Sequence, residues 1–278
     1  MAPLPRKRFG QHWLRSDRTL NQIVAAAELL PQDRVLEIGP GQGVLTQRLL
    51  SLVAAVVAVE IDRDLCERLA KQWGSRENFL LLQGDFLTLN LVELLAAFPH
   101  LQQPNKVVAN IPYNITGPIL EKVLGTIAQP ALSPYDTIVL LLQKEVAERL
   151  CAQPGSKAYG ALSVRVQYLA TAELICRVPA GAFYPPPKVD SAVVRLRPRT
   201  VPWPVNQPRD LDRLVTAGFA TRRKMLRNSL SPLIDRDQLS HFLEELKINP
   251  QARAEDLSLA QWIALTNAFL LSSGSSQN

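Results

Sequence analysis

Residues 34–44, Arg34-Val35-Leu36-Glu37-Ile38-Gly39-Pro40-Gly41-Gln42-Gly43-Val44, decide the fold. The short apolar run is typical of a strand buried in a parallel sheet. A glycine turn follows, and the apolar spacing after it predicts a helix over 44–52. Strand, glycine turn and helix form the first unit of a nucleotide-binding α/β fold. The dinucleotide fingerprint needs Gly or Ala at position 44, and the Val44 of this chain does not match it.

Four successive predicted strands end in a glycine turn or a polar side chain. The strands span 34–38, 54–59, 79–82 and 107–109, and the groups that follow them are Gly39 with Gly41, Glu60, Asp85 and Asn110. Ligands of open α/β sheets bind at this edge. We expect Glu60 to accept the ribose hydroxyls of a nucleoside and Asp85 to accept its adenine amino group. The G-x-G-x-G spacing after Glu37 favours S-adenosylmethionine (SAM), because a loop without Cβ atoms approaches a ligand closely. The sequence thus predicts a Rossmann-like class I SAM-dependent methyltransferase.

The fourth of these strands runs into Asn110-Ile111-Pro112-Tyr113, which we predict to be catalytic. Asn-x-Pro-Tyr after a strand is the motif of enzymes that methylate exocyclic amines such as N6 of adenine. The lone pair of that nitrogen is delocalised into the purine ring. Acceptors fixed on its N–H bonds, the Asn110 side chain and the Ile111 carbonyl, would localise the lone pair and stabilise the charge that develops. An ordinary strand exit with a turn proline explains the tetrapeptide equally well when it is taken alone.

Composition and charge indicate a soluble protein with a polyanionic partner. The 278 residues carry a formal net charge of +6, and 195–230 alone hold nine Lys or Arg against two Asp. A second basic cluster, Arg6-Lys7-Arg8, lies near the N-terminus, and such patches favour nucleic acid. The longest apolar run, 49–59, is too short to cross a membrane, and no signal-peptide core is present. Three widely spaced cysteines support neither a disulfide framework nor a metal site. We therefore expect a cytoplasmic protein without a metal.

The chain divides at a proline-rich stretch, 198–208, into two predicted domains. Residues 1–200 form the methyltransferase domain with a basic N-terminal arm. Residues 201–271 form a small helical domain that binds RNA or the ribosome, and 272–278 form a disordered tail. Helices are expected at 16–30, 62–73, 118–124, 161–168, 210–230, 235–246 and 257–271. Strands at 172–178 and 191–197 are expected to form an antiparallel edge of the sheet.

Two further groups of residues are predicted to contact RNA. Phe183 and Tyr184 lie in a proline-rich loop, 179–188, as two exposed-looking aromatic residues, and either could stack on a base held out of its helix; we assign Phe183 to the substrate RNA. The basic residues of the predicted helix 210–230 would contact phosphates rather than read bases. They are Arg222, Arg223, Lys224 and Arg227.

Several segments together resemble a known family, the bacterial ribosomal small-subunit RNA adenine dimethyltransferases (KsgA/RsmA family), over nearly the full length. These segments are RKRFGQHWL (6–14), EIGPG (37–41), NIPYNI (110–115), LQKE (142–145), SKAYG (156–160), PPPKVDSAVVR (185–195) and RRKMLRNSL (222–230). The resemblance implies dimethylation at N6 of two adjacent adenosines in the 3′-terminal hairpin of 16S rRNA and a role in late small-subunit assembly. We also expect a monomer.

By the same resemblance, SAM contacts fall on His12, Leu14, Gly39, Glu60, Asp85 and Asn110. Relatives often carry Asn in place of His12 and Phe in place of Trp13. Two alternatives stay open at this point. One is a related enzyme that dimethylates large-subunit RNA and confers antibiotic resistance. The other is a non-enzymatic assembly or transcription factor on the same fold, although the intact Asn110–Tyr113 motif argues against it.

Overall fold

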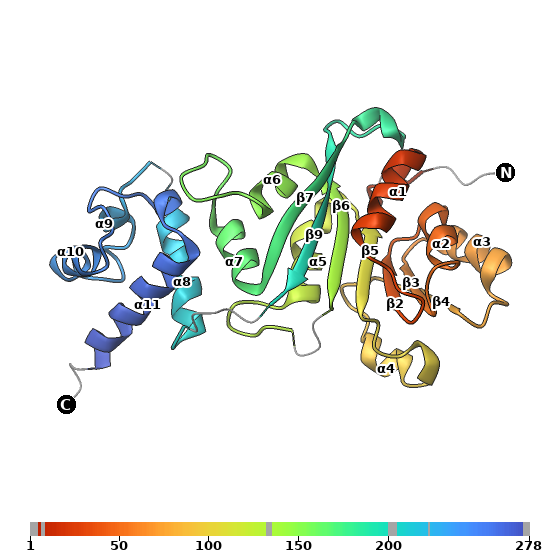
Figure 1. Cartoon of the computed structure of the whole chain (residues 1–278), viewed down its shortest axis with the longest axis horizontal. Helices are drawn as coiled ribbons and strands as arrows, with labels where there is room; N and C mark the ends of the chain where they lie inside the picture. Colours follow the sequence, from red (N-terminus) through yellow and green to blue (C-terminus); the bar gives the residue numbers. More distant parts are fainter. Residues whose placement is uncertain (1–4, 7–8, 132–134, 200–204, 222, 275–278) are drawn as a thin grey trace. The chain divides into compact units, whose positions relative to one another are not determined.

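The computed structural model describes residues 5–6, 9–131, 135–199, 205–221 and 223–274, with backbone only for 271–274 (Figure 1). The chain divides into two compact units. The first comprises 1–123, 132–147 and 172–198, and the second comprises 124–131, 148–171 and 199–278. Residues 148–171 thus join the C-terminal unit, whereas the sequence analysis grouped them with the sheet.

A seven-stranded sheet in the order β4-β3-β2-β5-β6-β9-β7 organises the first unit (Figure 1). Its strands are β2 (Arg34–Ile38), β3 (Ala55–Glu60), β4 (Phe79–Gln83), β5 (Lys106–Asn110), β6 (Thr137–Gln143), β7 (Ala170–Val178) and β9 (Ser191–Pro198). Five neighbouring strands, β4, β3, β2, β5 and β6, are parallel to one another. Strand β9 runs antiparallel to β6, with Gln143 opposite Ser191. The predicted strands and the antiparallel edge are confirmed. Continuous apolar sequence in β3, β5 and β6 places both faces of the sheet in the core.

The helices predicted for this unit are confirmed, most with shorter bounds and the one over 118–124 with an earlier start at 116, and the structure adds a helix over 91–95. The helices are α1 (Asp17–Ala26), α2 (Val44–Leu49), α3 (Arg63–Trp73), α4 (Leu91–Leu95), α5 (Thr116–Leu124) and α6 (Lys144–Leu150), with 3-10 turns η2 (Pro99–Leu101), η3 (Tyr113–Ile115) and η4 (Ala180–Ala182). Ser16 caps α1 by accepting from the Thr19 N–H. A separate two-stranded sheet pairs β1 (Trp13–Leu14) with β8 (Phe183–Tyr184). It ties the N-terminal segment to the hairpin loop between β7 and β9.

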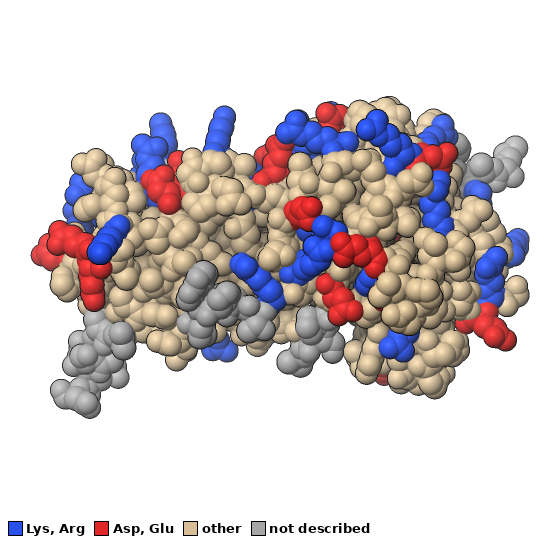
Figure 2. All heavy atoms as spheres, viewed as in Figure 1, with Lys and Arg blue, Asp and Glu red and all other residues tan. Residues whose placement is uncertain are grey.

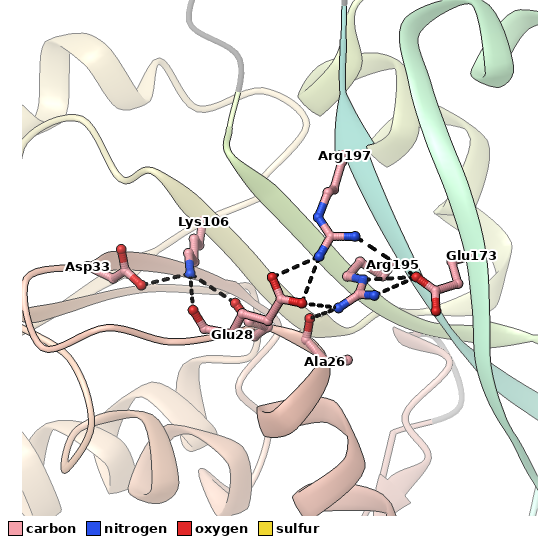
Figure 3. Close-up of polar contacts among 8 residues, drawn as sticks. Ala26, Glu28, Asp33, Lys106, Glu173, Arg195 and Arg197 are labelled. Atoms are coloured by element: carbon pink, nitrogen blue, oxygen red, sulfur yellow. Dashed lines mark hydrogen bonds and ion pairs between the residues drawn. The ribbon is translucent and has the colours of Figure 1, made fainter.

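Ion pairs tie strands to helix α1 at the amino edge of the sheet (Figure 3). The Lys106 ammonium, at the start of β5, bonds the Asp33 carboxylate at 2.8 Å and also the Ala27 and Glu28 carbonyls. On β9, Arg195 pairs with Glu28 and Glu173, and Arg197 pairs with Glu28. The carbonyl groups at the end of α1 are thereby capped by cations, which complement the negative end of a helix.

The second unit is helical around an aromatic core. It contains α7 (Ala161–Leu169), α8 (Pro208–Phe219), α9 (Leu226–Ser229), α10 (Arg236–Glu245), the 3-10 turn η5 (Ala254–Asp256) and α11 (Leu259–Gly274). The Phe219 ring lies 5.8 Å from that of Trp262 and 6.2 Å from that of Tyr159. A Cβ on Gly218 would approach Trp262 to 2.5 Å, so the helices pack too closely there for a larger residue. Burial raises the pKa of Tyr159 to about 12.

Two predictions about the helices of this unit are wrong. The sequence predicted one helix over 210–230, but α8 ends at Phe219 and α9 begins at Leu226. Between them Met225 is extended and forms a β-bridge with Arg253, and the Leu226 N–H donates to the Ala252 carbonyl. This backbone pairing, between residues far apart in sequence, interrupts the helix. The predicted tail over 272–278 is also wrong in part, because α11 continues to residue 274; 275–278 lie outside the described residues.

Candidate active site

A cleft of about 1040 Å³, including the solvent at its mouth, lies at the carboxyl edge of the parallel strands. Its lining contains every residue that the sequence analysis assigned to the cofactor or to the catalytic motif: His12, Leu14, Gly39, Gly41, Glu60, Asp85, Asn110, Ile111, Pro112 and Tyr113. These residues come from β1 and from the ends of four parallel strands. The parallel topology explains the gathering, because the carboxyl ends of such strands meet at one edge.

The glycine loop and Glu60 form one continuous wall of the cleft. Gly41 adopts a φ of +58°, which favours glycine, and its N–H donates to Glu60 Oε2 at 3.1 Å. Glu60 Oε1 accepts from the Asp62 N–H at 2.9 Å. Each carboxylate oxygen carries a second lone pair, so Glu60 can still accept two ligand hydroxyls. Burial raises the pKa of Glu60, while these two backbone bonds act against the rise.

A second acid, Glu37, lines the cleft beneath the glycine loop. It is 1% exposed, and its Oε2 accepts from the Thr46 hydroxyl at 2.6 Å. Burial raises the pKa of Glu37 to about 8; the Thr46 hydrogen bond opposes the rise, and the charge of Glu60 adds to it. A cationic ligand group would lower the raised pKa values of these two carboxyl groups and favour their ionised forms.

The turn after β4 lines the cleft next to Glu60, whose carbonyl accepts from the Gly84 N–H at 2.8 Å, and the turn is held from outside the cleft. Asp85 Oδ1 accepts from the Leu87 N–H at 2.9 Å, and the buried Phe86 ring lines the cleft. Lys122, on α5, donates to the carbonyls of Leu87 and Leu89 at 3.1 and 2.7 Å, and its ammonium lies 5.0 Å from the Phe86 ring centroid. The sequence analysis missed Lys122. A lysine on an amphipathic helix carries no local signal of this role.

Asn110 is fixed in one orientation at the end of β5. Its Nδ2 donates to the main-chain carbonyl of His12 at 3.2 Å. The amide oxygen therefore faces away from His12, and no described residue donates to it or to the Ile111 carbonyl. Two open acceptors at the mouth of a cleft are the groups that would hold the two N–H bonds of an amine.

Tyr113 is held by contacts from two other parts of the chain. Its hydroxyl lies 2.5 Å from the Ser191 hydroxyl of β9, and its ring lies 5.8 Å from that of His12 at an interplanar angle of 18°. His12 Nδ1 lies 2.8 Å from the Pro185 carbonyl, which can only accept, so Nδ1 carries a proton. Burial raises the pKa of Tyr113, and the Ser191 hydrogen bond opposes the rise. His12 thus supports Tyr113 with its side chain and Asn110 with its carbonyl.

Ion pairs and a hydrogen bond join the N-terminal arm to the start of α3. Arg6 bonds the carboxylates of Asp62 and Asp64, and Gln11 donates to Asp62 at 3.0 Å. Asp62 also caps α3 through the Asp64 N–H. Of the predicted basic cluster only Arg6 is described, and its charge is used within the protein; Lys7 and Arg8 lie outside the described residues.

The prediction that Phe183 presents an exposed ring is wrong. Phe183 is 4% exposed and packs in the core cluster with Leu14 and Ile23, and it does not line the cleft. Side chains alternate along a strand, so β8 turns Phe183 inward and leaves Tyr184 42% exposed. The alternation could have been anticipated only with knowledge that these two residues form a strand paired to β1.

The predicted basic patch over 195–230 separates into paired and unpaired charges. Arg195 and Arg197 are neutralised by acids of the first unit, and Arg213 pairs with Asp210 at 3.1 Å. In the second unit, three exposed cations between α8 and α9 or on α9 have no acidic partner among the described residues: Arg223, Lys224 and Arg227. Arg222, predicted with them, lies outside the described residues.

The chemistry of the cleft residues suits SAM. Open acceptors on Glu60 and Asp85 suit a nucleoside, and the buried acids suit a sulfonium cation. Within the described part of the chain, no three His, Cys, Asp or Glu side chains gather as a metal site. No helix in the same ranges is long and apolar enough to cross a membrane.

Comparisons with known proteins identify the family of the chain. A family model described as ribosomal RNA adenine dimethylase matches residues 4–270. Proteins named ribosomal RNA small subunit methyltransferase A are 67% identical in Nostoc sp. and 64% in Nostoc punctiforme, covering 95% and 97% of this chain and 97% and 96% of theirs.

Solved structures show the same fold. A dimethyladenosine transferase from Plasmodium falciparum matches with a TM-score of 0.77 and 27% identity, covering 95% of this chain and 98% of its own. The 23S rRNA methyltransferase ErmE matches with a TM-score of 0.72 and 28% identity, covering 92% and 99%. The predicted Rossmann-like methyltransferase fold and the resemblance drawn from the sequence are both confirmed, and the chain belongs to the ribosomal RNA adenine dimethylase family.

Proposed function

We propose that this protein uses SAM to dimethylate N6 of two adjacent adenosines in the 3′-terminal hairpin of 16S rRNA, late in small-subunit assembly. The observation that carries the proposal is the fixed orientation of Asn110, whose amide N–H is held by the His12 carbonyl while its oxygen is left open beside the Ile111 carbonyl. We further propose that it acts in the cytoplasm as a monomer and needs no metal.

The reaction requires a poor nucleophile to become a better one. The lone pair of an adenine N6 is delocalised into the ring. Hydrogen bonds from its two N–H groups to Asn110 Oδ1 and the Ile111 carbonyl would favour a pyramidal nitrogen with a localised lone pair, and these acceptors would stabilise the positive charge that develops. The Tyr113 ring, braced by His12 and Ser191, would stack on the target base and orient it.

Bound SAM supplies an electrophilic methyl group on its sulfonium. The residues proposed to hold it are Glu60 at the ribose, Asp85 at the adenine, and Gly39, Gly41, His12 and Leu14 along the cleft. No strong base is required, because N6 becomes acidic only as it gains the methyl group. Asn110 and Ile111 hold that proton until solvent removes it.

A second transfer places a different demand on the same acceptors. The monomethylated amine has one N–H, so only one of the two carbonyl groups retains a partner. Asn110 Oδ1 and the Ile111 carbonyl belong to different parts of the motif, a side chain and the backbone. Because either can hold the remaining N–H, the site accepts the product of its first reaction as a substrate.

The relatives favour small-subunit RNA over the alternatives. Proteins at 67% and 64% identity are named for the small subunit, while ErmE, named for 23S rRNA, is 28% identical. The intact Asn110–Tyr113 motif and an open cleft support an enzyme over a non-enzymatic factor.

The test is methyl transfer from labelled SAM to small subunits that lack this modification, with the acceptor mapped by primer extension. We expect blocks at two adjacent adenosines near the 3′ end. Transfer only to large-subunit RNA would select the resistance-type alternative. Binding to small subunits without transfer would leave an assembly factor and overturn the role of Asn110.

A further inference from the structure

An exposed aromatic ring and a cation form a preassembled pair beside the active site. Tyr184 is 42% exposed, and the Arg15 guanidinium lies 4.1 Å from its ring centroid. Both side chains belong to the small β1–β8 sheet or its immediate flank, and neither lines the cofactor cleft. The site described above therefore makes no use of them.

The backbone holds this pair rigidly on both sides. Trp13 is the strand partner of Tyr184, and Leu14 is the strand partner of Phe183. The Arg15 N–H donates to the Ala182 carbonyl at 2.8 Å, one residue before β8. Because Phe183 is anchored in the core, the alternation of β8 keeps Tyr184 facing outward. Little conformational entropy remains to be lost when a ligand stacks on such a ring.

The pair is connected to the catalytic motif by two contacts. Pro185, next to Tyr184, accepts from His12 Nδ1, and the His12 ring lies along Tyr113. The hairpin loop that carries Tyr184 ends at Ser191, whose hydroxyl contacts Tyr113. A nucleotide strand that places one base at Tyr113 would therefore pass close to Tyr184.

The segments that follow β1 and β8 carry unpaired positive charge. Arg15, Arg18 and Lys188 are exposed and have no acidic partner in the described ranges. The nearby acids are engaged elsewhere: Asp17 pairs with Arg48, and Asp190 accepts from the Ala180 N–H. Figure 2 shows Lys and Arg side chains gathered over the tip of the β7–β9 hairpin and the start of α1. The charge suits a polyanion and the exposed ring suits a base, which is the combination that binds single-stranded nucleic acid.

We infer that Tyr184 is a stacking platform for an unpaired nucleotide next to the target adenosine, with Arg15 and Lys188 on the adjoining phosphates. This inference rests on the proposed function, since it assigns a second contact to the same RNA. A target base held out of its helix leaves a neighbour without its stacking partner. Tyr184 replaces that partner, and Arg15 beneath the ring adds a cation–π contact.

The experiment compares Tyr184→Ala with Tyr184→Phe in the full-length protein, using undermethylated small subunits as substrate. Stacking on an aromatic ring contributes enough that Tyr184→Ala should raise the KM for subunits roughly tenfold. The Kd for SAM and the kcat at saturating subunits should stay within about twofold. Tyr184→Phe should behave as wild type, because the ring is retained. Phe98→Ala, a matched exposed aromatic at a distance from the site, should change none of these quantities.

Three results would overturn the inference. The first is an unchanged KM in Tyr184→Ala, and the second is an equal loss in Tyr184→Phe, which would assign the effect to the hydroxyl. The third is a weakened SAM affinity in Tyr184→Ala, which would make the ring a structural support for β1. Failure of the proposed function is distinct from all three, because the wild-type protein itself would then transfer no methyl group to small subunits.

Discussion

The two ends of strand β5 use polar groups in opposite ways. Lys106, at its start, is buried, and its ammonium reaches one carboxylate and two carbonyls. Asn110, at its end, has its amide N–H bound to His12 but its oxygen open. Four residues apart on the same strand, one polar group is saturated by the protein and the other is left for a ligand.

The same contrast extends across the sheet. At the amino edge, Arg195 and Arg197 of β9 are paired with Glu28 and Glu173, and Arg197 lowers the pKa of Glu28 through its hydrogen bonds (Figure 3). At the carboxyl edge of the parallel strands, Ser191, the first residue of the antiparallel β9, instead positions Tyr113. A saturated network contributes to folding, whereas an open acceptor costs stability and becomes useful when a ligand fills it. In this unit, polar groups with all their partners within the protein stabilise the fold, and polar groups with an open acceptor are free to bind a ligand.

The largest expected effect is at the open end of β5. Asn110→Ala removes the acceptor for the substrate amine, and we expect kcat to fall by roughly 10²–10³-fold, as when one preorganised polar group is deleted. The Kd for SAM, measured by calorimetry, should change only a few-fold, because Glu60 and Asp85 remain. Turnover close to wild type in this variant would refute the proposed role.

The saturated end of β5 should respond in stability instead. Lys106→Met leaves the buried Asp33 carboxylate without its cation, and we expect a loss of about 3 kcal/mol in the free energy of unfolding by urea denaturation. Burial alone raises the pKa of Asp33, but bonds from Asn105 and Lys106 hold it below its usual value. Specific activity of the folded fraction should be retained.

The matched control breaks an exposed ion pair. Arg63→Met removes the contact with Glu67 on the surface of α3, 3.0 Å long, and should cost less than about 0.5 kcal/mol. Equal losses in the two variants would show that saturation at the amino edge contributes nothing beyond an ordinary surface pair.

The carboxyl edge could be predicted from the sequence because its signals are local. The strand 34–38 and the glycine turn are contiguous, Glu60 and Asn110 end their strands, and Asp85 lies two residues after β4. Parallel topology then brings these ends together without knowledge of any particular contact. The amino edge offered no such signal, since Lys106 and Asp33 are 73 residues apart and either would pass for a surface charge.

The sequence predictions that failed depend on partners far along the chain. Phe183 faces inward because β8 pairs with β1, and the helix expected over 210–230 is interrupted because Met225 pairs with Arg253. Arg195 and Arg197 add to the basic patch predicted from the sequence, but in the structure Glu28 and Glu173 neutralise them. Periodicity and charge counts report a residue's own tendency, and tertiary pairing overrides it.

The pH dependence of unfolding shows whether the buried Glu37 carboxyl at the carboxyl edge lowers the stability of the fold. The pKa of Glu37 is about 8 in the folded protein and 4.5 is the ordinary value, so the unfolded chain ionises first as the pH rises. The free energy of unfolding should therefore fall between pH 5 and pH 8, by about 2 kcal/mol after allowance for relaxation. Glu37→Gln, measured without cofactor, should abolish that part of the pH dependence while leaving the stability at pH 5 similar. A variant with the wild-type slope would show that Glu37 is ionised throughout.

The unpaired cations of the second unit extend the comparison to charge. Replacing Arg223, Lys224 and Arg227 together by Gln should weaken binding to small subunits about tenfold at physiological salt and lower the salt slope by about two. Replacing the paired Arg195 and Arg197 should leave that slope unchanged, because their charge is already neutralised. An unchanged slope in the triple variant would exclude this surface as a phosphate contact.

The smallest effect is expected at Lys122, which is saturated like Lys106 but lies beside the cleft. Its bonds to Leu87 and Leu89 hold the turn that carries Asp85 and Phe86. Burial lowers the pKa of Lys122, and the charge of Asp85 opposes the change. Lys122→Met should raise the Kd for SAM about fivefold, equivalent to one lost hydrogen bond, with kcat at saturating SAM little changed.

Lys71→Met, an exposed lysine on α3, provides the control and should leave the Kd for SAM unaltered. A change in kcat alone in Lys122→Met would place the residue with the Asn110 motif, which α5 follows directly, rather than with the cofactor turn. A saturated polar group would then act on catalysis, and the separation seen along β5 would not hold for the helix beside it.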